Sequence, residues 1–344
     1  MEYTLSTRQL IIWFSKIKLM IRFLKNWTLP IAMISGVILY FIAAGIPFSV
    51  QSKHIIEQSI SILQPMLIFA MLFLTFCKIN VSELKPCKWH FYLLLIQSLS
   101  FVALAFLLYL FSDSDAKILI EGAMLCLICP TATAAAIVTN KLGGSAAHIT
   151  SYVILINLVT AILVPLVVSV VHPQEGATFM SSFIVILGKV FPLLLCPFVF
   201  AVILRVLSPK VHGFFGRHSG LSFYLWAVAL TLAIAITVRS IVHSNVSVWY
   251  QLGLALISLI ACIFQFYTGK KIGALYNDSI SAGQALGQKN TVLAIWLGYT
   301  FFTPITSVSM GFYSVWHNVF NSYQLYLQRK REEENNINNK ITQR

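Results

Sequence analysis

The chain has 344 residues, of which 58% are hydrophobic and only 10% are charged. A soluble domain carries roughly 25% charged residues, and repeated apolar runs of about 20 residues predict helices that cross a membrane. The sequence lacks the ten-residue alternating units that are typical of membrane barrels. We therefore expect an all-α polytopic membrane protein, whose net charge of +13 belongs to its loops and does not indicate binding to nucleic acid.

The first 26 residues combine basic and large apolar side chains. Arg8 and Lys16 alternate with residues such as Trp13 and Phe14, and no cleavable signal peptide is evident. This pattern predicts a cytoplasmic amphipathic anchor over residues 1–26 that contacts membrane lipid. A disordered basic tail is the alternative, which the large apolar residues disfavour.

Ten apolar segments follow between residues 27 and 328. By residue number they are 29–46, 59–77, 91–111, 118–140, 147–171, 179–204, 221–241, 249–268, 279–302 and 304–327. The remaining residues, 329–344, are charged and rich in asparagine, and we expect them to form a disordered cytoplasmic tail.

The lysines and arginines orient these segments. With the N-terminus inside, 19 of the 24 basic residues lie in inside loops and tails, and three lie at outside ends. Only Lys189 and Lys289 lie within apolar segments. This bias predicts a protein of the inner (cytoplasmic) membrane with both termini in the cytoplasm.

Two of the ten segments are interrupted. Pro130 breaks the fourth, because proline lacks an amide donor and clashes with the preceding turn, and Gly287 breaks the ninth. Each is therefore the fourth segment of a five-helix half, and an odd number of spans gives the halves opposite topology. We expect two inverted repeats, at about 27–172 and 179–328, with crossed discontinuous helices 4 and 9.

Polar residues surround both breaks. Thr131 and Thr133 follow Pro130, and Gln288, Lys289 and Asn290 follow Gly287. Backbone groups freed by a break must find partners in protein or water, because lipid offers none. If the breaks cross at mid-membrane, the N-termini of half-helices point into one polar cavity that attracts anions. The alternatives are a simple proline kink in the fourth segment and a polar patch satisfied between helices in the ninth.

Three runs of sequence resemble the bile acid:sodium symporter family, and the chain looks like a divergent bacterial-type member of it. The runs are Ile128–Gly144, Gly287–Pro304 and Ser314–Ser322, the last with a Trp-His-Asn motif. The resemblance implies a panel made of spans 1, 2, 6 and 7, and a core made of the other six spans, which carries the crossing helices.

The resemblance also implies roles for particular residues. Thr133 and Asn290 match positions that touch the anionic substrate in bacterial relatives, and His317 and Asn318 match a pair that faces the same cavity. Gln97 matches a glutamine that helps to coordinate sodium, so we regard it as the remnant of an ion site.

Other positions of the family's sodium sites are altered. The changed residues are Ala135, Ala136, Ile149, Val153, Ala285 and Lys289. Sodium needs oxygen ligands, and none of the eleven acidic residues is expected at mid-membrane: Glu121 lies nine residues before Pro130, about 13 Å along a helix. We therefore interpret Lys289 as a charge substitute that stands in for a sodium ion. If desolvation lowers its pKa, Lys289 can also exchange a proton and couple transport to pH. Proton coupling, exchange and facilitated diffusion all remain open, ahead of coupling to sodium. The alternative is a lysine that snorkels or pairs with carbonyl groups.

These patterns predict a secondary transporter of organic anions, bile-acid-like or small carboxylates, that works by alternating access. The candidate substrate-binding residues are Thr131, Thr133, Gln288, Lys289, Asn290, His317 and Asn318. Two alternatives remain: a membrane sensor or binding protein of the same fold that does not transport, and a cation/proton exchanger. The sequence shows no catalytic constellation, no zinc-spaced ligands and no phosphate loop, so we expect neither an enzyme nor a cofactor or metal.

Overall fold

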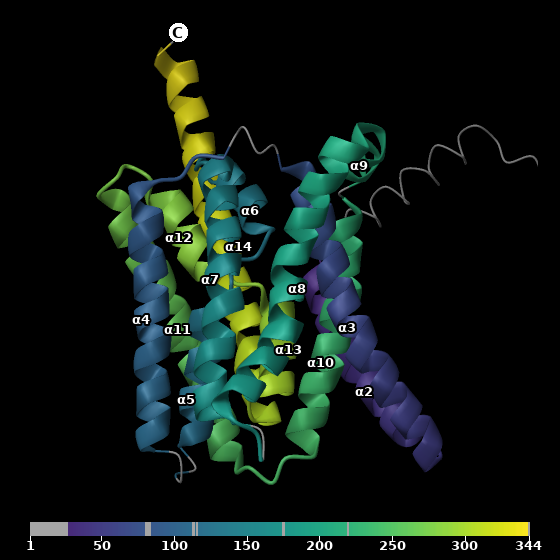
Figure 1. Ribbon diagram of the computed structural model, residues 1–344. Coiled ribbons are helices and arrows are strands. Elements are labelled where there is room, and N and C mark those ends of the chain that lie inside the picture. Colours follow the sequence, from purple (N-terminus) through teal and green to yellow (C-terminus); the bar gives the residue numbers. More distant parts are fainter. Residues whose placement is uncertain are drawn as a thin grey trace, which may run out of the picture.

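The computed structural model describes residues 27–79, 84–111, 114, 116–173, 176–218 and 220–342 (Figure 1). Within these residues the chain is helical, without strands. The helices are α2 (Thr28–Gly45), α3 (Val50–Lys78), α4 (Lys88–Leu110), α5 (Lys117–Ile128), α6 (Ala135–Lys141), α7 (Ala146–Val171), α8 (Phe179–Leu207), α9 (Pro209–Arg217), α10 (Leu221–Val242), α11 (Val248–Ala274), α12 (Ser279–Gly287), α13 (Thr291–Phe301), the 3-10 turn η2 (Pro304–Thr306) and α14 (Ser307–Thr342). The amphipathic anchor predicted for residues 1–26 lies outside the described residues.

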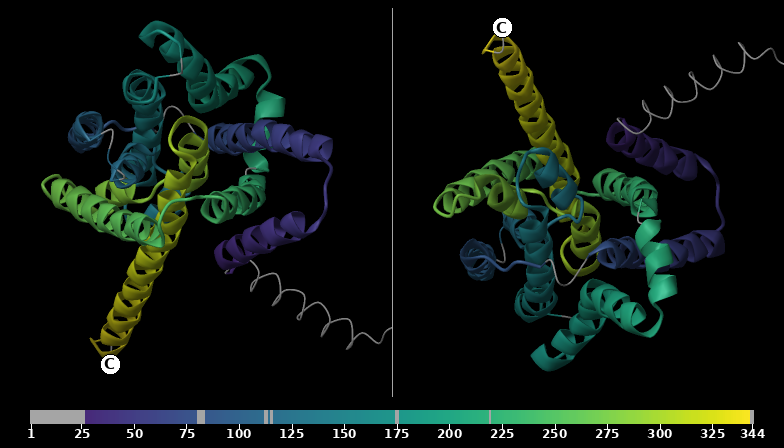
Figure 2. Two further views of the ribbon diagram at one scale, coloured as in Figure 1. Left: turned by 90° about the horizontal axis from the view of Figure 1, so that it is seen from below. Right: turned by 90° about the horizontal axis from the view of Figure 1, so that it is seen from above.

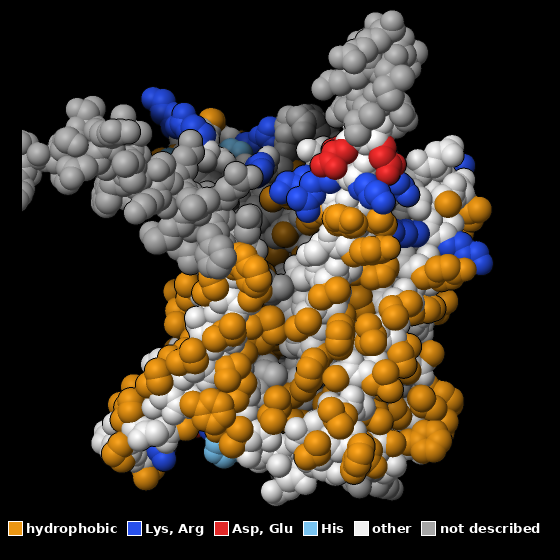
Figure 3. Space-filling model, turned by 180° about the vertical axis from the view of Figure 1, so that it is seen from behind, with side chains coloured by type: hydrophobic (Ala, Val, Ile, Leu, Met, Phe, Trp, Pro, Cys, Tyr) orange, Lys and Arg blue, Asp and Glu red, His pale blue; other side chains and the backbone are white. Residues whose placement is uncertain are grey.

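Six of the described helices are long and apolar enough to cross a membrane: α3, α4, α7, α8, α10 and α11. Their outer faces carry large apolar side chains such as Phe106, Val206 and Tyr267, which are 64–74% exposed. Figure 3 shows such side chains spread over the surface, with lysines and arginines gathered near one end. Exposed apolar surface of this extent is unfavourable in water and favourable in lipid. The prediction of an integral, all-helical membrane protein is confirmed at this level.

The helices pack in two groups that lie side by side (Figure 2). The four-helix group contains α2, α3, α8 and α10. The crossing group contains α4, α5, α6, α7, α11, α12, α13 and α14. The hairpin of α7 and α8 joins the groups, and α10 contacts α13, α14 and η2 across the boundary.

The last helix extends further than predicted. We expected a disordered tail from residue 329, but α14 continues to Thr342. A helix that is already formed extends at low cost, because each added residue gains a hydrogen bond without a new nucleus. The Gln328 amide also donates to Glu332 Oε1 across one turn, at 3.1 Å.

Two glycines allow α11 and α12 to approach closely. A Cβ atom on Gly269 would lie 2.5 Å from the carbonyl oxygen of Ala282, and one on Gly273 would lie 2.5 Å from Ala282 Cβ. Small residues four apart on a helix are typical of tight packing in membranes. This contact fixes α12, and with it the second break, against α11.

Candidate functional site at the crossing of two broken helices

The two interruptions meet and pair through their backbones. The extended residues after α5 run antiparallel to those after α12, with a bridge between Thr131 and Lys289. The Asn290 amide donates to the Pro130 carbonyl and the Ala132 amide donates to the Gln288 carbonyl, both at 2.8 Å. Each break therefore supplies hydrogen-bond partners for the other, as the absence of water in a membrane requires. The sequence placed both breaks correctly.

Side chains from several helices cover the carbonyl groups at the end of α5. Gln265 donates to the carbonyl of Cys126 at 3.1 Å, and Lys289 donates to the carbonyl of Leu127 at 3.3 Å. Gln97 and Thr160 both donate to the carbonyl of Ile128, and Gln97 also donates to the carbonyl of Cys129, at distances of 3.1–3.2 Å. The carbonyls that a helix leaves unpaired at its C-terminus all have donors here.

Lys289 is enclosed within the crossing, with 1% of its surface exposed. Its ammonium group bonds to the carbonyl oxygen of Leu127, at the negative end of the α5 dipole. The thiols of Cys126, Cys129 and Cys262 lie within electrostatic range of it. Among the described residues, no carboxylate forms an ion pair with Lys289. The carbonyl of Leu127, at the negative end of α5, thus holds the positive charge within the crossing.

Gln97 serves as a helix cap in this structure. Its amide nitrogen is shared between the carbonyls of Ile128 and Cys129, and its oxygen accepts from the Tyr152 hydroxyl at 3.2 Å. The carbonyl of Ala285, a position where the resemblance implies a glutamate, accepts from the Thr131 hydroxyl. Both polar atoms of the Gln97 side chain are therefore engaged in hydrogen bonds with protein groups.

The other residues predicted at the breaks differ in whether their polar atoms are free to contact a ligand. Thr131 is buried and occupied by its bond to Ala285, and Asn290 Oδ1 caps α13 by accepting from the Leu293 amide at 3.4 Å. Gln288 is 5% exposed and its Oε1 has no partner among the described residues. Thr133 is partly exposed at the edge of the crossing. Gln288 and Thr133 are thus the residues here with the most freedom to contact a ligand.

Helix α14 brings His317 to the second break through Tyr313. The Tyr313 hydroxyl donates to the Gly287 carbonyl at 2.8 Å, and its ring meets the His317 imidazole edge-on, with centroids 5.7 Å apart. His317 is 5% exposed and its Nδ1 has no partner among the described residues. Asn318 is only half-buried and donates to the Ser314 carbonyl on its own helix, at 2.7 Å. Sequence reasoning missed Tyr313, which lies one turn before His317 and carries no motif.

A buried carboxylate at the other end of α5 was also missed. Glu121 is 0% exposed and accepts from the Thr303 amide at 2.9 Å and from the Thr303 hydroxyl at 3.1 Å. His172 Nε2 lies 3.3 Å from Glu121 Oε1. Thr303 also lines an open cavity of about 310 Å³ with Arg239 and His243. The signal in the sequence was an acid inside an apolar run, which we assigned to the water-facing end of the helix.

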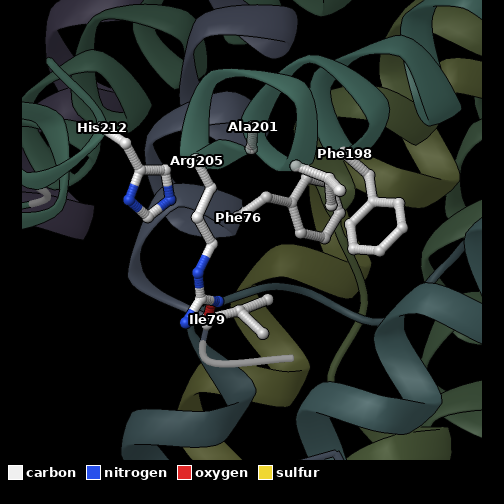
Figure 4. Close-up of a pocket in the computed structure, with 7 residues that line it drawn as sticks. Phe76, Ile79, Phe198, Ala201, Arg205 and His212 are labelled. Atoms are coloured by element: carbon white, nitrogen blue, oxygen red, sulfur yellow. The ribbon is translucent and has the colours of Figure 1, made fainter. Parts of the chain in front are cut away.

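A smaller pocket lies between α3, α8 and α9, away from the crossing (Figure 4). Arg205 donates to the Ile79 carbonyl at 3.4 Å, beside Phe76 and Phe198. Partial burial and the guanidinium group of Arg205 lower the pKa of His212 on α9. None of the residues predicted for the site lines this pocket.

Comparison of the sequence with family models and with curated proteins finds no match.

Proposed function

We propose that the protein is a secondary transporter of organic anions, bile-acid-like or small carboxylates. The observation that carries this proposal is the pairing of two broken helices at Thr131 and Lys289, with a lysine ammonium enclosed between them. Broken helices that cross inside a membrane are typical of transporter binding sites, and a buried intramembrane charge is usually functional. The resemblance to bile acid:sodium symporters in the same segments supports the same reading.

Lys289 takes the electrostatic place of a coupling sodium ion in this proposal. In transporters of this architecture, carbonyl groups at the C-terminal ends of half-helices coordinate the coupling ion. The ammonium of Lys289 bonds to such a carbonyl, that of Leu127. A cation that is part of the protein keeps the site attractive to an anion without bound sodium.

Alternating access in this proposal is a movement of the crossing group against the four-helix group, with ten spans in two inverted repeats. The contacts that must change include those of α10 with α13, α14 and η2 and those of α3 with α13, while α7 and α8 connect the two groups. The end of the molecule that gathers lysines and arginines, from which α14 projects, is placed in the cytoplasm by the positive-inside rule (Figures 1 and 3). We propose that the membrane is the inner membrane and that both termini are cytoplasmic.

Uptake into proteoliposomes tests this function. Labelled taurocholate, pyruvate and lactate are offered to the wild type, to Lys289→Met and to Lys189→Met. The matched control removes the only other lysine inside an apolar segment, which is exposed and lies 6.0 Å from the centroid of the Phe301 ring. We expect uptake of at least one anion by the wild type and Lys189→Met, and loss of it in Lys289→Met. Equal uptake by all three proteins, or none by the wild type above empty liposomes, contradicts the proposal.

A further inference from the structure

A row of polar side chains, three buried and one partly buried, runs along one face of α14. Ser314, His317, Asn321 and Gln324 follow one another at intervals of three, four and three residues, which places them on the same side of a helix. Ser314, His317 and Asn321 are 1–5% exposed. Each of the four carries a polar atom without a hydrogen-bond partner among the described residues. Buried polar atoms are normally paired, so a row of four indicates a function.

Helix α12 presents polar side chains to the same seam. Gln284 Nε2 donates to Asn321 Oδ1 at 2.9 Å and links the two helices. Gln284 of α12 and Gln288, the extended residue that follows α12, are 1% and 5% exposed, and each has an Oε1 without a partner in the described structure. We call these six residues, Ser314, His317, Asn321, Gln324, Gln284 and Gln288, the polar seam.

The polar seam adjoins the surroundings of Lys289. His317 packs against Tyr313, whose hydroxyl accepts from Gln265 at 3.1 Å and donates to the backbone of the second break. The Cys262 thiol lies within interaction range of both Tyr313 and Lys289. Polar groups thus follow one another from Gln324, the member of the polar seam closest to the C-terminal end of α14, through Tyr313 and Cys262 toward the enclosed ammonium.

We propose that the polar seam carries protons between the cytoplasm and Lys289, so that a proton is the coupling ion. This inference rests on the proposed transport function. A proton enters at Gln324 and passes along water held by the amides of Asn321 and Gln284. The His317 imidazole accepts it on one ring nitrogen and releases another from the second. The Tyr313 hydroxyl relays a proton in the same way to the Cys262 thiol, which interacts with both Tyr313 and Lys289. The thiol passes its own proton on, and the neutral amine of Lys289 takes it up as an ammonium group.

Only N–H and O–H bonds form and break in this sequence, and release of the proton follows the reverse order. The titratable groups near Lys289 are the thiols of Cys126 and Cys129 on α5 and of Cys262 on α11. Near His317 the described titratable group is Tyr313. Lys270 of α11 is a charged group beside α12 and α14; its ammonium lies 5.5 Å from the Phe320 ring centroid and within electrostatic range of Arg331 on α14. Histidines serve in the proton relays of membrane transporters, and His317 is the titratable member of the polar seam.

The test separates proton coupling from anion movement. Proteoliposomes containing the wild type, Gln284→Leu, Asn321→Leu or Asn321→Ser are assayed with labelled taurocholate and pyruvate. One arm measures accumulation under an imposed pH gradient, with a pH-sensitive dye inside the vesicles. The other measures exchange of labelled for unlabelled anion at equal pH on both sides, which requires no net proton movement. Ser322→Leu is the matched control, because it places leucine on an exposed position of the same helix.

We expect both leucine variants to lose gradient-driven accumulation and anion-induced proton flux while they retain exchange. Asn321→Ser, which keeps a polar group in the row, and Ser322→Leu are expected to retain both activities. If the wild type exchanges anions but its accumulation does not respond to the pH gradient, the proton path is overturned and the transport function stands. Equal loss of exchange and accumulation in the leucine variants also overturns it, because a structural role then explains the row. Absence of exchange in the wild type overturns the transport function itself.

Discussion

Gly287 lies under an aromatic side chain that leaves no room for a methyl group. A Cβ atom at this position would lie 2.4 Å from Cγ of Phe266 and 2.5–2.6 Å from its two Cδ atoms. Carbon atoms in contact prefer separations of about 3.5–4.0 Å, so the ring or the break has to move by about 1 Å. Phe266 is fully buried and stacks on Phe320, with ring centroids 4.5 Å apart. We predict that Gly287→Ala lowers the free energy of unfolding by about 1–3 kcal/mol, the usual cost of overpacking.

Thermal unfolding of the purified protein in detergent measures this effect. Gly188→Ala is the control, because its Cβ atom meets nothing within 4 Å and alanine there stabilises a helix by about 0.5–1 kcal/mol. Phe266→Ala alone costs about 3–5 kcal/mol, and Gly287→Ala added to it costs nothing further, because the clashing ring atoms are gone. A Gly287→Ala variant as stable as the wild type, or additive losses in the double variant, refutes this reasoning.

Three further variants probe other contacts. We expect Lys289→Met to abolish anion uptake, because it removes the buried ammonium and leaves the Leu127 carbonyl without its donor. Uptake is compared with that of Lys189→Met in vesicles of the same composition, and full uptake by Lys289→Met refutes the prediction. Glu121→Leu leaves the amide and hydroxyl of Thr303 unpaired, at about 1–3 kcal/mol each, whereas Glu121→Gln loses less; unfolding temperatures rank the two, and the reverse order contradicts the assignment. Gly269→Ala pushes α12 away from α11 and destabilises the protein by about 1–3 kcal/mol relative to a Gly213→Ala control, which has open space; equal stability of the two argues against the close approach.

The breaks were predictable because their causes are local. Pro130 lacks a backbone donor wherever it lies, and a glycine followed by polar residues interrupts an apolar run in the sequence itself. The helices on either side begin and end close to the predicted positions. The membrane character was equally accessible, since composition and run length decide it.

The partners of the buried polar groups were not predictable, because they come from distant parts of the chain. Glu121 is bonded to Thr303, 182 residues later, and Lys289 to a carbonyl 162 residues earlier. A pattern along the chain reports which residues share a helix face, not which helix lies opposite. For the same reason, Gln97 was assigned to an ion site by resemblance, whereas the structure uses it to cap α5.

Only part of the polar seam could be predicted from the sequence. The spacing of Ser314, His317, Asn321 and Gln324 fits one helix face, yet only His317 belonged to a motif. The bond from Gln284 to Asn321 depends on how α12 and α14 pack against α11. Packing therefore turned separate polar residues into one candidate path.

Anion uptake in the absence of sodium tests most directly whether the ammonium of Lys289 takes the place of a coupling sodium ion. Initial rates of taurocholate and pyruvate uptake by the wild type are measured in proteoliposomes while choline progressively replaces sodium. We predict rates that do not change with the sodium concentration. Strict dependence of uptake on sodium contradicts the proposal, because a bound sodium ion then supplies the charge that we assign to Lys289.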